Sequence, residues 1–247
     1  MVPPHIKLSF YGDTFDLLRK PPASGQTTTY PLNRRAAIKD IIEGLGVPHS
    51  EVGAILCNQL NQTFNFIPQG GEHFHIHPLS PAISPLKPTT LRPQPIPDFR
   101  FMVDINVNRL GELLRMAGLN ALSAPPVTNR ELARTARDKH RILLSRNREL
   151  LKHSTLVHGR LVRSQHPDEQ LAEIINLYQL QHFIQPFSLC MRCKGRLSDV
   201  PKDEILDELL PLTRKYYSSF KRCTDCRKIY WRGSHHSHMM EKLERFM

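Results

Sequence analysis

Residues 100–104 read Arg-Phe-Met-Val-Asp and residues 141–145 read Arg-Ile-Leu-Leu-Ser, and these two short apolar runs decide the fold of the C-terminal half. A run of this length, bounded by polar residues, is typical of a strand that is buried on both faces. Two further runs, at 119–124 and 156–163, have the same character. The sequence therefore predicts four strands in this region.

Helical segments separate these strands. Apolar residues at helical spacing, together with cap and stop signals, predict helices over 110–117, 129–139, 148–152 and from 164 or 168 to about 178. Strands that alternate with helices predict a parallel sheet with helices on both faces, and the site of such a sheet lies at the carboxyl ends of its strands. Asp104 and the Ser145-Arg146-Asn147 run follow two of these ends.

A proline-rich segment precedes this sheet. Seven prolines occur from Pro78 to Pro97. Proline lacks a backbone N–H and fixes φ, so neither a helix nor a central strand is expected there, and the segment is interpreted as a semi-rigid extended linker. We expect domain boundaries that divide the chain into residues 1–79, 80–98, 99–183 and 184–247.

The part before the linker has the element order of a β-grasp domain. Alternating or apolar runs predict strands at 5–11, 27–32, 53–57, 64–67 and 73–77. A helix over 36–45, which Gly46 ends, lies between the second and third of these strands. Two strands, one helix and then short strands is the β-grasp order.

Four of the five cysteines form two C-x-x-C pairs. They are Cys190, Cys193, Cys223 and Cys226, and 29 residues separate the two pairs. Two such pairs match a tetrahedral zinc site, whereas a redox dithiol expects a single pair at the start of a helix. A site with four thiolates is closed, so we expect this zinc to be structural. Cys57 stands alone in an apolar run and is interpreted as a buried small hydrophobe.

The positive charge lies in the C-terminal part. Residues 1–77 hold six Lys/Arg and six Asp/Glu, while residues 78–247 hold 28 and 17, so the latter carry the whole net charge of +11. This concentration favours a nucleic-acid partner over a surface that only maintains solubility. With no signal-peptide pattern and no apolar run of about 20 residues, a cytoplasmic protein without a membrane partner is expected.

The N-terminal residues also resemble the ubiquitin-like domain of the sulfur-carrier type. The resemblance rests on residues 37–49, on Glu51-Val52 and Asn58, and on the glycine-containing turn at Gly70-Gly71. Sulfur carriers are activated at a C-terminal diglycine, but here the chain continues past Gly71 into another strand. No thiocarboxylate chemistry is therefore inferred, and a docking or stabilising module that contacts a protein partner is expected.

From Phe101 to Phe246 the chain resembles the mut-seven C-terminal RNase family, a PIN-like group whose members often carry this ubiquitin-like domain. The matching segments are residues 101–104, 110–118, 141–144, 161–164, 169–171, 186–190 and 230–235, together with the two cysteine pairs. The resemblance implies a fold with both α/β and α+β parts: a β-grasp domain, then a PIN-like parallel-sheet domain that ends in a zinc ribbon.

PIN-like nucleases gather three or four carboxylates that hold Mg²⁺ or Mn²⁺ at the carboxyl edge of the sheet, because hard cations prefer oxygen ligands. Asp104 matches the first of these acids. At the next two expected places this sequence has Asn129 and Asn147. Asn147 is a candidate neutral ligand, because an amide oxygen can bind a metal but brings no charge. Glu131 is a candidate substitute, although its capping-box spacing explains it equally well.

The resemblance implies phosphate binding by Arg115, Arg146 and Arg163, while Arg115 has the alternative of binding helix carbonyls. Three functions stay open: a metal-dependent ribonuclease with a thinned acidic site, an inactive RNA-binding module, and a protein-interaction adaptor with structural zinc. Whether the chain is an enzyme stays open, because the chain resembles a PIN-like ribonuclease but has Asn147 in place of an expected acid. A group of aromatic residues, Tyr216, Tyr217, Phe220, Tyr230 and Trp231, is interpreted as ribbon core, with base stacking as the alternative.

Overall fold

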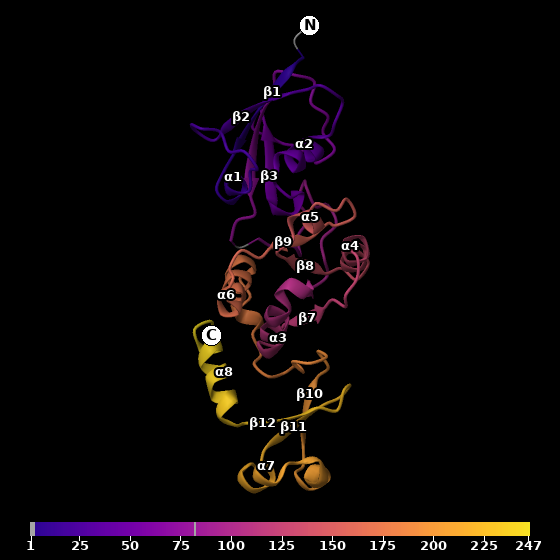
Figure 1. Cartoon of the computed structure of the whole chain (residues 1–247), viewed down its shortest axis with the longest axis vertical. Helices are drawn as coiled ribbons and strands as arrows, with labels where there is room; N and C mark the ends of the chain where they lie inside the picture. The colour runs from indigo at the N-terminus through magenta and orange to yellow at the C-terminus, as the bar shows by residue number, and fades with distance from the viewer. Residues whose placement is uncertain (1–2, 82) are drawn as a thin grey trace. The chain divides into compact units, whose positions relative to one another are not determined.

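The structure is a computed structural model that describes residues 3–81 and 83–247, apart from the side chains of residues 234 and 235 (Figure 1). The chain divides into two compact units. The first contains residues 1–99 and 126–162, and the second contains residues 100–125 and 163–247. Segments from both sides of the predicted linker thus share the first unit, and the expected RNase domain contributes to both units.

The β-grasp domain predicted at the N-terminus is present in the first unit. Its elements are β1 (His5–Phe10), α1 (Asp13–Asp16), β2 (Thr27–Pro31), α2 (Ile38–Leu45), η1 (His49–Glu51), β3 (Val52–Cys57), β4 (Leu60–Asn61) and β5 (His73–Pro78). The sheet has the order β2-β1-β5-β3-β4, and β1 runs parallel to β5. This parallel central pair joins the first and last strands of the domain.

Helix α2 is amphipathic and buries Ile38, Ile41 and Ile42 against the sheet side of the domain. Each such side chain contributes about 1.5–3 kcal/mol when it is fully buried. The helix ends at Gly46, whose φ of 119° is left-handed. A Cβ on Gly46 would lie 2.8 Å from the Leu17 carbonyl oxygen, so this C-cap has room only for glycine.

The strand predicted at residues 64–67 is wrong. These residues form a turn and no strand. The carbonyls of Phe64 and Phe66 accept hydrogen bonds from the N–H groups of Lys39 and Ile38, at 3.2 and 2.7 Å. The first N–H groups of a helix lack partners within it, so these carbonyls satisfy the start of α2 instead of a ladder.

The first unit also contains α4 (Asn129–Asp138), β8 (Ile142–Ser145), α5 (Arg148–Leu151) and β9 (Gly159–Leu161). Strands β8 and β9 pair in parallel, as predicted. Strand β9 is shorter than the expected run at 156–163. At its N-terminal side, the carbonyls of Leu156 and Val157 accept instead from His49 Nε2 of the β-grasp domain at 2.8 Å and from Arg92 Nε of the proline-rich segment at 3.2 Å.

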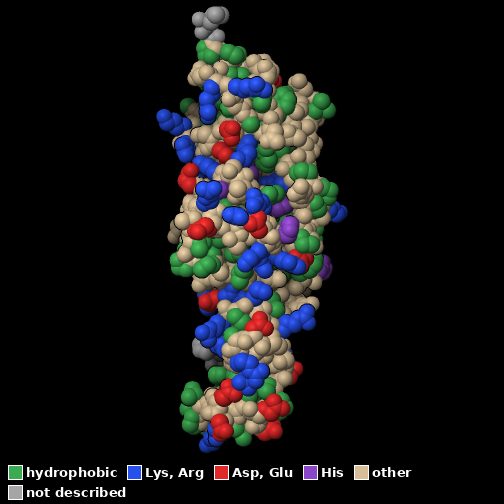
Figure 2. All heavy atoms as spheres, turned by 90° about the vertical axis from the view of Figure 1, so that its right-hand side faces the viewer, with side chains coloured by type: hydrophobic (Ala, Val, Ile, Leu, Met, Phe, Trp, Pro, Cys, Tyr) green, Lys and Arg blue, Asp and Glu red, His purple; other side chains and the backbone are tan. Residues whose placement is uncertain are grey.

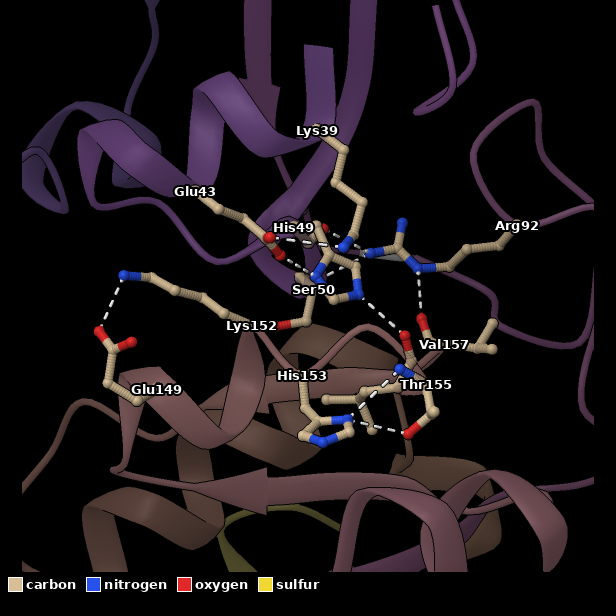
Figure 3. A network of polar contacts seen from close by, with 11 residues as sticks. Lys39, Glu43, His49, Ser50, Arg92, Glu149, Lys152, His153, Thr155 and Val157 are labelled. Atoms are coloured by element: carbon tan, nitrogen blue, oxygen red, sulfur yellow. Dashed lines mark hydrogen bonds and ion pairs between the residues drawn. The ribbon is translucent and has the colours of Figure 1, made fainter. Parts of the chain in front are cut away.

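A buried polar network joins the β-grasp domain to residues 156–161 (Figure 3 shows its part around His49). Glu51, whose side chain is fully buried, accepts from Arg160 Nη1 and from the Leu161 N–H, both at 2.7 Å. His49 lies between the Leu156 carbonyl and the Glu43 carboxylate, 2.5 Å from its Nδ1. The ubiquitin-like domain is therefore packed as a part of this unit.

The proline-rich segment takes part in the same network. The described residues between β5 and β6 form neither helix nor strand, as predicted. The buried Arg92 nevertheless donates to four carbonyls, those of His49, Ser50, Val52 and Val157. Leu91 and Ile96, which are close to Arg92 in the sequence, are also buried. The segment is thus anchored to the unit through residues 91–96.

Replacing Glu51 with Gln tests the buried pair. The variant leaves the Arg160 guanidinium buried without its closest carboxylate, so we expect a loss of about 3 kcal/mol in unfolding free energy by urea denaturation. The control is Asp138→Asn, which breaks exposed pairs with Arg134 and Arg137, whose side chains are 73% and 44% exposed. These pairs should contribute less than about 1 kcal/mol. An equal loss of unfolding free energy in both variants would show that burial does not strengthen the Glu51–Arg160 pair.

His158 makes the stability of this unit depend on pH. Burial, and then the charge of Arg92, lower the pKa of His158 to about 4, and its Nε2 lies 3.3 Å from the Gln94 carbonyl oxygen. Between about pH 6.5 and pH 4 the unfolded chain binds the extra proton, so stability is present above this window and is lost as pH falls through it.

We therefore expect His158→Gln to flatten the decline of unfolding free energy between pH 6.5 and pH 4. The difference from the unmodified protein should reach up to about 3 kcal/mol at the acidic end, read from urea denaturation at several pH values. Parallel curves for the two proteins would show that the His158 imidazole is not held neutral.

The second unit begins with β6 (Arg100–Val103), η2 (Ile105–Val107), α3 (Asn108–Met116) and β7 (Asn120–Ser123). Strands β6 and β7 pair in parallel, so the predicted strand–helix–strand order is confirmed here too. Helix α6 (Pro167–Tyr178) packs against α3. Residues Phe101, Met102 and Val103 are buried, in agreement with a strand covered on both faces.

The ribbon at the end of the chain consists of η3 (Gln181–Phe183), β10 (Leu197–Val200), η4 (Asp203–Glu208), α7 (Pro211–Tyr216), β11 (Phe220–Cys223), β12 (Ile229–Trp231) and α8 (Ser234–Glu244). Its three strands are antiparallel in the order β10-β11-β12. Asp168 of α6 pairs with Lys242 of α8, and its carbonyl accepts from Arg245. Among the described residues, no helix is both long and apolar enough to cross a membrane.

Candidate metal centre and nuclease site

The four cysteines of the two C-x-x-C pairs meet in one cluster in the second unit. Their Sγ atoms all lie within 4.8 Å of one another, with 3.6 Å between Cys190 and Cys226 and 3.4 Å between Cys193 and Cys223. Four sulfurs at about 2.3 Å from a central zinc are about 3.8 Å apart. The cluster therefore fits a tetrahedral metal such as zinc.

Tight backbone turns present these sulfurs. In the first turn the Cys190 N–H donates to the Gly195 carbonyl at 2.7 Å, and Lys194 has a left-handed φ of 69°. A Cβ on Gly195 would lie 2.8 Å from Cys223 Sγ, so the two turns approach closely only with glycine there. In the second turn the Cys226 N–H points to Cys223 Sγ at 3.5 Å. The two C-x-x-C turns thus place all four sulfurs around one point.

Tyr230 supports the ionised form of one ligand. Its hydroxyl lies 3.1 Å from Cys190 Sγ. Burial raises the pKa of Cys190, but hydrogen bonds from Tyr230 and from the N–H groups of Cys193 and Arg192 outweigh it and lower the pKa to about 6. Because a thiolate is the form that binds metal, this contact favours metal binding. The sequence analysis did not assign this role to Tyr230.

Arg115 connects the ribbon to α3 and β7. Its side chain is buried, with Nε 2.7 Å from the Met191 carbonyl oxygen and Nη1 3.2 Å from both the Ala121 carbonyl and Ser123 Oγ. Met191 lies between the two cysteines of the first pair. The acceptors lie in the ribbon and in β7, and not at the end of α3 where the alternative places them. Phosphate binding by Arg115 stays a prediction.

Asp104 follows β6, at the carboxyl end where the sequence predicts a site. Its Oδ1 accepts from the Ile105 N–H and its Oδ2 accepts from Asn106 Nδ2, both at 2.7 Å. The carboxylate is nearly buried and ordered by its own loop. Asn106, which the sequence analysis overlooked, stands two residues after the acid and orients it.

In the first unit, the two positions at which the resemblance leads us to expect further acids lie side by side. Asn147 Nδ2 is 3.5 Å from Asn129 Oδ1, so the end of β8 meets the start of α4. Asn147 Oδ1 also accepts from the N–H groups of Glu149 and Leu150 and so caps α5. Both of its acceptor lone pairs are thereby used. Two neutral amides occupy this place instead of two carboxylates.

Glu131 forms the capping box that its spacing predicts. Its Oε2 accepts from the Thr128 N–H at 2.9 Å and from Thr128 Oγ1 at 2.8 Å, and the Glu131 N–H points to Thr128 Oγ1. The hydrogen bond from the Thr128 backbone lowers the pKa of Glu131, which keeps it ionised. The carboxylate therefore serves the start of α4.

The two remaining arginines differ in exposure. Arg146 is exposed in the turn between β8 and α5. Arg163 is partly buried after β9, and its N–H donates to Glu173 Oε2 at 3.0 Å. Lys and Arg side chains are spread widely over the face shown in Figure 2. A role in phosphate binding stays a prediction for both residues.

These features define a ribonuclease-like protein with a ubiquitin-like domain in its first unit and a four-cysteine centre in its second. The model of the Mut7-C RNAse domain matches residues 99–243, and that of the Mut7-C ubiquitin domain matches residues 3–84. The chain belongs to the Mut7-C RNase domain family. No curated protein and no solved structure gave a significant match.

The metal content of the purified protein tests the cysteine centre. We expect one zinc ion per chain by elemental analysis, lost in Cys190→Ser, and a Co²⁺-substituted form with the absorption of tetrahedral thiolate coordination. Chelation should unfold the ribbon. The control is Cys57→Ser, which removes the buried cysteine of the β-grasp domain and should leave the metal content unchanged. Metal retention by Cys190→Ser would contradict the assignment.

Proposed function

We propose that this protein binds RNA on a ribonuclease scaffold and cleaves it slowly if at all, with Asp104 as the metal-binding carboxylate. The observation that carries the proposal is the pair of amides at Asn129 and Asn147, where the resemblance expects acids. RNA is the proposed partner because the net charge of +11 lies entirely after residue 77.

The amides weaken metal-dependent catalysis in two ways. Each replaces a carboxylate and so removes one negative charge that would attract Mg²⁺ or Mn²⁺. In addition, Asn147 Oδ1 already accepts two N–H groups of α5, so it binds a metal only if it gives up this cap. One carboxylate ordered by Asn106 is a poor site for a hard cation on its own.

Weak metal-dependent ribonuclease activity is the second candidate. Asp104 is almost buried, follows a parallel strand and is held by its loop, which is how a ligand of a nuclease metal is positioned. A metal bound there would neutralise the scissile phosphate and activate water. Asp104 would then hold the ion.

Cleavage of labelled single-stranded RNA with Mn²⁺ separates the two candidates. We expect little cleavage by the unmodified protein and at least a tenfold increase in Asn129→Asp/Asn147→Asp, because the variant restores two carboxylates. Aspartate caps helices as well as asparagine and is favourable in a first helical turn, so the fold should tolerate both changes. Adding Asp104→Ala to that variant should abolish the gain.

The matched control is Asn61→Asp/Asn176→Asp, which adds the same charge at two exposed asparagines. It should leave cleavage unchanged. RNA binding, measured by anisotropy without metal, should survive Asp104→Ala and weaken steeply with salt. Rapid cleavage by the unmodified protein that Asp104→Ala removes would establish the enzyme instead. Absence of RNA binding at low salt would refute the proposed function.

A further inference from the structure

The structure separates the aromatic residues of the ribbon into two groups. Phe220 is 2% exposed and packs with Ile205 and Leu209, with Tyr217 against them. This part of the expected core is confirmed. Trp231 is 39% exposed and Tyr216 is 66% exposed, although a ribbon of this size has few large apolar side chains with which to form a core. Exposed aromatic rings that lie together are typical of a binding surface.

Trp231 borders two hollows on the surface of the ribbon. The first, of about 470 Å³, is lined by Phe187, Tyr230 and Met239, among others. The second, of about 670 Å³, is lined by Tyr216 and Tyr217. The indole ring of Trp231 is therefore accessible from grooves whose walls are mainly aromatic rings and methionines.

The indole is held in place from one side. Its ring centroid lies 6.3 Å from that of Tyr217. A Cβ on Gly233 would lie 3.3 Å from Trp231 Nε1 and 3.3 Å from the Tyr217 hydroxyl, so the backbone approaches the ring closely at this glycine. A ring fixed in this manner loses little freedom when a flat partner stacks on it.

Positive charges accompany these rings, and two lysine ammonium groups each lie over one face of a tyrosine ring. Lys215 Nζ lies 5.4 Å from the Tyr216 ring centroid, and Lys228 Nζ lies 5.4 Å from that of Tyr230. Lys221 and Arg232 line the first hollow. Residues 184–247 hold 13 Lys/Arg against eight Asp/Glu. Flat apolar surfaces between cations match the alternation of bases and phosphates in a single strand.

We propose that Trp231 and Tyr216 form a stacking site for unpaired bases of single-stranded RNA, with Lys215, Lys228 and Arg232 contacting the phosphates. This inference rests on the proposed RNA-binding function and adds where and how the strand is held. The site reads no sequence by itself, because every base presents a π face. The exposed Leu212 also lines the second hollow and extends its apolar surface.

Trp231 is the only tryptophan of the chain, so its fluorescence reports on this site alone. The zinc-loaded full-length protein is titrated with a single-stranded oligouridylate and, in parallel, with an abasic oligonucleotide of the same phosphate count and with heparin. We expect quenching with the oligouridylate only, because the other two polyanions carry no bases to stack.

Affinity measurements on variants complete the test. Trp231→Ala should weaken oligouridylate binding about tenfold, and Trp231→Phe should retain most of the affinity. Unchanged zinc content shows that the ribbon of each variant is folded. The control is Leu60→Ala, which truncates an apolar side chain that is 67% exposed in the β-grasp domain and lines neither hollow, and it should have no effect.

The outcomes separate this inference from the function on which it rests. If RNA binds in a salt-dependent way while Trp231 fluorescence and the Trp231→Ala affinity do not change, the stacking site is refuted and RNA binding stands. If neither oligonucleotide binds, both proposals fall. If Leu212→Ala and Trp231→Ala both abolish a self-association seen by sedimentation and leave RNA affinity unchanged, the surface is an interface between copies of the chain.

Discussion

The carboxylate of Glu51 is wholly buried, and it accepts hydrogen bonds from the Arg160 guanidinium and the Leu161 N–H at 2.7 Å. A buried ion pair is tolerated only with good geometry and further hydrogen bonds, since removing either charge leaves the other unpaired in a medium of low polarity. Arg92 supplies such support by binding the carbonyls around Glu51. The ubiquitin-like domain thereby becomes a structural part of the unit that carries β8, β9 and Asn147.

A second set of contacts orders the other unit around the cysteine cluster. Arg115 reaches from α3 to the carbonyl of Met191 inside the first cysteine pair, while Tyr230 donates to the Cys190 sulfur. Metal binding should therefore stabilise the ribbon and α3 together, because the same turn serves both. Metal binding should also fix the position of Trp231, because Trp231 follows Tyr230 in β12.

The candidate nuclease residues make hydrogen bonds to their own loops or to the starts of nearby helices. Asn147 caps α5, Glu131 caps α4 and Asp104 is ordered by its own loop. The cap that Asn147 forms accounts for an asparagine at this position in terms of the fold alone.

The sequence by itself determined what depends on neighbours along the chain: the β-grasp order, the strand–helix alternation, the capping box at Thr128 and the cysteine pairs. Periodicity, caps and short ligand spacings involve residues that are close in the sequence, so they can be recognised without knowledge of the fold. Only the tertiary structure decided the fate of Phe64 and Phe66, the length of β9, the burial of Arg115 and the separation of Trp231 from Phe220. Each of these depends on a partner distant in the sequence, such as the free N–H groups of α2 or the carbonyl of Met191, and no local pattern specifies which distant group a chain segment will meet.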